Sequence, residues 1–134
     1  MKVAVDTNIL LRDLLNDNPQ QASRAEEILD KAELVAVSLP VLCEFAWVLR
    51  QGYKKSCAEV ALAIRVLVGS DNVVTDTPAI QAGLAVLDEG GDFADGVIAH
   101  EGAWLGAEEF VSFDVKAIEL LKAQGKRARL LSAG

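Results

Sequence analysis

Short apolar runs alternate along the chain with longer segments whose apolar residues recur at helical spacing. The apolar runs predict strands over residues 2–6, 34–38, 72–75, 110–113 and 127–131. The longer segments predict helices over residues 19–32, 40–51, 57–68, 77–89, 92–104 and 114–124. Apolar strands separated by helices are typical of a parallel sheet covered on both faces. The predicted fold class is therefore α/β, a three-layer α/β/α sandwich with a mostly parallel central sheet.

Proline and glycine mark several of the predicted helix boundaries. Asn18-Pro19 places a capping residue before a first-turn proline, and Pro40 opens a later helix. Gly52 and the pair Gly90-Gly91 mark helix ends. The chain has 134 residues without a linker or repeat, so we expect one domain over residues 1–134.

Carboxylates stand where the predicted strands end. Asp6 follows the first strand, and Asp114 follows the strand over 110–113. Asp92 and Asp95 open a helix, and Glu44 lies inside another, in a window (LVAVSLPVLCEFAWVL) with no other carboxylate and no base. Ligands of parallel α/β folds bind at the carboxyl ends of the strands. We therefore expect these acids to face one crevice.

Each acid also has a local explanation. Asp92 and Asp114 suit helix capping, which we favour for Asp92, and Asp6 suits a turn after a strand. Asp95 suits the positive end of a helix dipole. Glu44 needs another explanation, because a helix interior has no cap and an unpaired buried carboxylate is unfavourable. It either reaches water past its neighbours or has a positive partner.

A cluster of acids without histidine or cysteine favours a hard divalent cation. Carboxylates that lie close together repel one another, and their pKa values rise unless a cation lies between them. Oxygen ligands alone select Mg²⁺ or Mn²⁺, and we expect one or two ions. Such ions neutralise phosphate charge and lower the pKa of bound water. The acids therefore predict metal-assisted phosphodiester hydrolysis.

The formal net charge of −7 argues against a nucleic-acid-binding surface made of lysine and arginine, and it suits a cation or a basic partner. Cys43 and Cys57 do not form a zinc site, because no second pair or histidine cluster accompanies them.

The start MKVAVDTN is not a signal peptide, and no apolar run is long enough to cross a membrane. We expect a cytoplasmic protein.

Four stretches resemble the motifs of PIN-domain nucleases, in order and over nearly the whole chain. They are VAVDTNILLR, LPVLCEFAWVLRQGY, GGDFADGVIAH and VSFD. Their spacing is closest to that of the VapC-like toxins of bacterial toxin–antitoxin pairs. The resemblance implies a Mg²⁺-dependent endoribonuclease that cuts single-stranded or structured RNA, forms a homodimer and is inhibited by a small antitoxin.

The resemblance also implies roles for individual residues. Asp6, Glu44, Asp95 and Asp114 match the family's catalytic, metal-binding acids, with Asp92 a further candidate ligand. Thr7, Asn8 and Ser112 match positions that support these carboxylates by hydrogen bonds; local backbone capping is an equal alternative for the two hydroxyls. Gly96 departs from the family, which usually has alanine there. Glycine should loosen that helix turn by up to about 1 kcal/mol.

Few residues outside the acids carry a functional signal. His100, the only histidine, is expected to be a surface or packing residue. Trp47 and Trp104 are expected in the core or in a dimer contact rather than as base-stacking platforms. Basic residues expected around the acidic crevice are more often ordinary surface residues than RNA contacts. They are Arg12, Arg50, Lys54, Lys55 and Lys116.

Other functions compete with the nuclease. A phosphoacceptor receiver needs an acid pair after its first strand, and a DxD phosphatase needs a second aspartate where this chain has Asn8. Neither scheme gives Glu44 a role. A non-catalytic module that binds a metal or a basic peptide through its acids remains open, and a nuclease assay with and without EDTA separates it from the enzyme. An inhibitory antitoxin would place arginine or lysine among the carboxylates.

Overall fold

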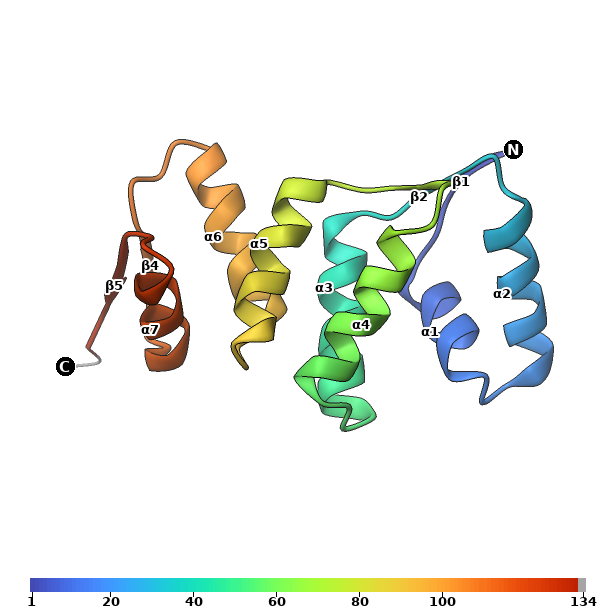
Figure 1. Cartoon of the computed structure of the whole chain (residues 1–134), viewed down its shortest axis with the longest axis horizontal. Coiled ribbons are helices and arrows are strands. Elements are labelled where there is room, and N and C mark those ends of the chain that lie inside the picture. The colour runs from blue at the N-terminus through green and yellow to red at the C-terminus, as the bar shows by residue number, and fades with distance from the viewer. Residues whose placement is uncertain (133–134) are drawn as a thin grey trace. The chain divides into compact units, whose positions relative to one another are not determined.

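The computed structural model describes residues 1–132, which contain five short strands, seven α-helices and one π-helical turn. The chain divides into two compact units, Met1–Asp76 and a second that begins at Thr77, and each is described by itself (Figure 1). The α/β class with parallel strands is confirmed. The expectation of one domain is not decided by this division and stays a prediction. Within the described residues, no helix has the length and apolar character of a membrane span.

The first unit contains a parallel sheet in the order β1-β2-β3. Its strands are β1 (Lys2–Ala4), β2 (Leu34–Ala36) and β3 (Val73–Val74). Parallel neighbours need crossover connections, which helices supply here. The helical elements between the strands are α1 (Thr7–Leu15), α2 (Pro19–Lys31), α3 (Leu39–Trp47), η1 (Val48–Gly52) and α4 (Cys57–Val68).

The core of the first unit is aliphatic and lies where α3 and α4 meet the sheet. Val35, Leu42, Val60 and Ile64 have no exposed surface. Burying a side chain of this size stabilises a fold by about 1.5–3 kcal/mol. Because Leu42 faces the core, the opposite face of α3 is available for function.

Two elements of the first unit were not indicated by the sequence. Helix α1 begins directly after Asp6, where we expect only a turn, although the buried Leu10 and Leu11 follow at helical spacing. The π-helical turn η1 extends α3 to Gly52. Such turns are often found at functional sites.

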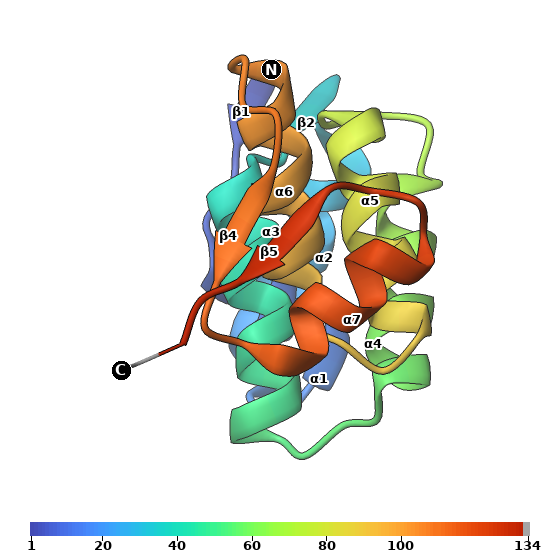
Figure 2. The same cartoon turned by 90° about the vertical axis from the view of Figure 1, so that its left-hand side faces the viewer.

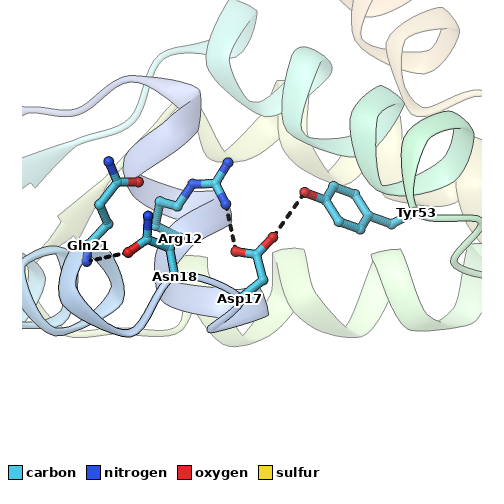
Figure 3. Close-up of polar contacts among 5 residues, drawn as sticks. All are labelled: Arg12, Asp17, Asn18, Gln21 and Tyr53. Carbon is cyan, nitrogen blue, oxygen red and sulfur yellow. Dashed lines mark hydrogen bonds and ion pairs between the residues drawn. The ribbon is translucent and has the colours of Figure 1, made fainter.

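Polar contacts join the turn between α1 and α2 to the residue after η1 (Figure 3). Arg12 Nη1 donates to Asp17 Oδ1 at 2.6 Å, and the Tyr53 hydroxyl donates to Asp17 Oδ2 at 3.4 Å. The hydrogen bond from Arg12 is the main cause that lowers the pKa of Asp17. Nearby, Asn18 accepts from the Gln21 amide at 3.2 Å, which confirms the predicted cap of α2.

The second unit contains a helical hairpin and a two-stranded parallel sheet. The hairpin consists of α5 (Thr77–Asp88) and α6 (Phe93–Trp104). In the sheet, β4 (Phe110–Ser112) pairs with β5 (Ala128–Leu130), and α7 (Val115–Ala123) makes the crossover (Figure 2). The strands of residues 1–132 thus form two hydrogen-bonded sheets, one in each unit.

Glycines let α5 and α6 approach closely. A Cβ added at Gly96 of α6 would collide with the Ala82 carbonyl oxygen and lie 2.8 Å from the Gly83 Cα. A Cβ at Gly83 would lie 2.6 Å from the Phe93 ring. The expectation that Gly96 merely loosens its helix is therefore wrong, because the backbone of α5 occupies the space that an alanine methyl group needs.

Candidate functional site

Two of the predicted site residues lie in the first unit. Asp6 follows β1 and caps α1, since its Oδ1 accepts from the Ile9 amide at 3.2 Å. Glu44 lies on the exposed face of α3, opposite the buried Leu42 and Phe45. Of the two explanations for Glu44, its exposure favours access to water over a buried positive partner.

The other predicted acids lie in the second unit, also at helix starts. Asp92 caps α6 by accepting from the Ala94 amide at 3.0 Å. Asp114 caps α7 by accepting from the Ala117 amide at 3.1 Å, and its own amide donates to Ser112 Oγ at 3.0 Å. The capping role favoured for Asp92 is confirmed, and the capping of Ser112 supports its local explanation.

Capping and metal binding do not exclude each other at these positions. Each capping bond uses Oδ1 of Asp6, Asp92 or Asp114, and Oδ2 makes no hydrogen bond to any described residue. A cap also fixes the side-chain rotamer, which is how supporting hydrogen bonds orient metal ligands. These carboxylates are therefore positioned, and each keeps one oxygen available.

The pKa of Asp95 is raised by its surroundings. Burial is the largest cause, followed by the charges of Asp92 and Asp114, and together they raise its pKa to about 6. A divalent cation would relieve both effects, because it stabilises the ionised form and offsets repulsion between the carboxylates. Carboxylate oxygens are the ligand type that a hard cation prefers.

The structure does not gather the four predicted ligands into one cluster. Among residues 1–132, no three acidic, histidine or cysteine side chains come close enough to share a metal ion. It brings the charges of Asp92 and Asp114 close enough to act on Asp95. Asp6 and Glu44 belong to the other unit, so the four-residue site stays a prediction.

Comparison of the sequence with models of protein families identifies the family of this chain. The model of the PIN domain matches residues 3–122, which is most of the chain. The chain belongs to the PIN domain family. PIN domains are typically metal-dependent nucleases and generally bind Mg²⁺. A comparison with curated proteins finds no match.

Two of the basic residues that are candidate RNA contacts in this PIN domain instead bind residues close to them in the sequence. Arg12 pairs with Asp17, and Arg50 Nη1 donates to the Lys55 carbonyl oxygen at 2.8 Å. Lys54 and Lys116 have exposed side chains. Of the supporting residues, Thr7 is buried and Asn8 is exposed, and their roles stay predictions.

The two tryptophans do not belong to the core. Trp47 on α3 is 59% exposed and Trp104 at the end of α6 is 84% exposed. The core half of the expectation is therefore wrong, and the alternative of a dimer contact stays a prediction. Helical spacing could not reveal this, because both residues follow apolar segments that do face the core.

The first unit also has a groove that the sequence did not indicate. Its volume is about 830 Å³, and residues of α1, α2 and α4 supply most of its apolar floor. Acidic residues outnumber the single base, Lys55, among its lining; the acids are Asp13, Asp30, Glu59 and Asp71. Burial and the charges of Glu26 and Asp30 raise the pKa of Asp13. The groove therefore suits an apolar surface that carries positive charge.

The raised pKa of Asp95 predicts a pH-dependent stability difference from the Asp95→Asn variant. Well below its ordinary pKa of 3.8, the group is protonated in both the folded and the unfolded chain. As the pH rises to about 6, the unfolded chain releases its proton first, so ionisation favours unfolding. We expect the wild type to lose stability relative to Asp95→Asn over this window and the difference to stay constant above it. Urea unfolding in EDTA at several pH values measures it, and a difference independent of pH would contradict the assignment.

Proposed function

We propose that this PIN domain is a Mg²⁺- or Mn²⁺-dependent endoribonuclease that hydrolyses RNA phosphodiester bonds. The observation that carries the proposal is the set of capped carboxylates after β1 and β4, each with one oxygen available. The family match supports it independently, and the raised pKa of Asp95 agrees with a concentration of negative charge near Asp114.

In the proposed mechanism, Asp6, Asp95 and Asp114 would hold one or two ions, and Asp92 is an additional candidate ligand. Such an ion would supply positive charge against the phosphate and would lower the pKa of a bound water. Glu44 orients the attacking water and accepts its proton, a role that an exposed carboxylate on a rigid helix can perform. Thr7, Asn8 and Ser112 hold the neighbouring backbone and carboxylates in place.

We further propose that the enzyme is the toxin of a bacterial toxin–antitoxin pair. The acidic groove of the first unit supports an inhibitor with a basic amphipathic segment, because its apolar face would fill the groove and its bases would meet Asp13 and Asp30. A cytoplasmic location and a homodimer complete the proposal. A short neighbouring reading frame encoding a DNA-binding head and a basic tail would support it.

Cleavage of RNA by the purified chain tests the enzymatic proposal. We expect cleavage with Mg²⁺, its loss in EDTA and its return when Mg²⁺ is restored. Glu44→Gln and Asp6→Asn should each lower the rate by about 100-fold or more, as the loss of a general base or a ligand does. Asp13→Asn removes an acid from the groove and is the matched control, which should cleave like the wild type.

Two outcomes would contradict the proposal in different ways. Wild-type rates in both Glu44→Gln and Asp6→Asn would show that the residues are wrongly assigned. A folded wild-type chain that cleaves no RNA yet binds a basic peptide would favour the non-catalytic interaction module.

A further inference from the structure

The outward face of α3 carries one stripe of exposed side chains. Glu44, Trp47 and Gln51 are exposed, whereas Phe45 and Leu49 between them are buried. Residues three apart share a face of an α-helix, so Glu44 and Trp47 lie on one face of α3. Gln51 lies in the π-helical turn that follows α3 directly.

Trp47 is the unusual member of the stripe. It is 59% exposed, several other large apolar side chains of the described residues are exposed as well, and it is the aromatic member of the stripe. It lies about 4.5 Å along the helix axis from Glu44, at a rise of about 1.5 Å per residue. An aromatic ring thus stands one turn from the proposed general base.

From this juxtaposition we propose that Trp47 stacks on the RNA base that flanks the scissile phosphate. The inference rests on the proposed nuclease function and deepens it by naming a substrate contact. Single-stranded RNA is recognised largely by stacking of unpaired bases on aromatic rings, and such stacking tolerates any sequence.

The neighbours of Trp47 favour an RNA base over an apolar protein surface. The stripe is polar on both sides of the indole, with a carboxylate at Glu44 and an amide at Gln51. The core of a protein interface is depleted in charged residues, and an isolated ring between polar groups does not match it. Gln51 can both donate to and accept from a base edge.

A phosphate contact is available at the end of the same segment. Lys54 is exposed and has a φ of 55°, which turns the chain directly after Tyr53. Its ammonium group is a mobile point charge suited to a phosphate. By contrast, Tyr53 donates to Asp17, so it is not assigned to base stacking.

Fluorescence of Trp47 tests binding without relying on cleavage. Trp104→Phe leaves Trp47 as the sole tryptophan, and adding Asp95→Asn prevents turnover. Titration with a random-sequence single-stranded RNA pool in Mg²⁺ should quench the emission, as a stacked base does. RNA binding measured by anisotropy with unchanged Trp47 emission would overturn the inference.

Kinetics then separate a substrate contact from a structural role. Trp47→Ala should raise KM for the RNA pool roughly tenfold, and Trp47→Phe should restore most of the loss because it keeps a ring. Trp104→Ala is the control and should leave KM unchanged. Unchanged KM in Trp47→Ala would overturn the inference. If this variant also converts a dimer to a monomer in sedimentation, the ring contacts a second copy of the chain instead. If the wild type cleaves no RNA while the emission of Trp104→Phe is quenched, the nuclease proposal fails, and Trp47 stacks on a base of bound RNA that the chain does not cut.

Discussion

Replacing Asp95 with asparagine is expected to abolish metal-dependent RNA cleavage while making the metal-free chain more stable. The amide has nearly the shape of the carboxyl group but carries no charge, so it is a poor ligand for Mg²⁺. It also removes a half-buried negative charge, which the charges of Asp92 and Asp114 repel. We expect cleavage to fall by about 100-fold or more.

The gain in stability should be about 1 kcal/mol at pH 7.5 in EDTA, because solvent partly screens the charges around Asp95. Thermal unfolding with and without Mg²⁺ measures it. Added Mg²⁺ should stabilise the wild type and have little effect on Asp95→Asn, since a ligand stabilises only the state that binds it. Asp13→Asn is the control for removing an acid of raised pKa elsewhere, and it should keep both cleavage and stabilisation by Mg²⁺. Full cleavage by Asp95→Asn would remove this residue from the site.

Replacing Gly96 with alanine is expected to destabilise the fold. The added methyl group would collide with the Ala82 carbonyl oxygen, and backbone is less able to move aside than a side chain. Overpacking of this kind costs about 1–3 kcal/mol, more than the gain of up to about 1 kcal/mol from better helix propensity. We expect a lower urea midpoint and a melting temperature lower by several degrees.

Gly102→Ala is the matched control on the same helix. A Cβ at Gly102 would meet only Ala107 Cβ, at 4.0 Å, which is ordinary contact. This variant should be as stable as the wild type or more stable by up to about 1 kcal/mol. If Gly96→Ala were as stable as Gly102→Ala, α5 and α6 would not pack as closely as described.

Local signals in the sequence sufficed for most of the fold. Asn18-Pro19 marks a real helix start, because a cap and a first-turn proline act within a few residues. Helix α5 begins at Thr77, as its predicted range does. Helix α4 has the predicted bounds, Cys57–Val68. The strands are shorter than predicted, since pairing ends where a partner strand ends: β3 pairs only through Val73 and Val74.

What depends on contacts between distant segments could not be predicted. The role of Gly96 follows from the backbone of α5, and the exposure of Trp47 follows from which face of α3 packs on the core. The acids were recognisable by their places after strands and by the PIN resemblance. Their capping bonds and the raised pKa of Asp95 required the folded geometry.

Calorimetric titration with Mn²⁺ tests the central proposal, that Asp6 and Asp114 are both metal ligands. We predict that the wild type binds one or two ions and that Asp6→Asn and Asp114→Asn each abolish this binding or weaken it at least about tenfold, as loss of a ligand does. Asp13→Asn should bind like the wild type. Unchanged Mn²⁺ affinity in Asp6→Asn, with binding lost only in Asp114→Asn, would contradict the claim and confine the metal to the second unit.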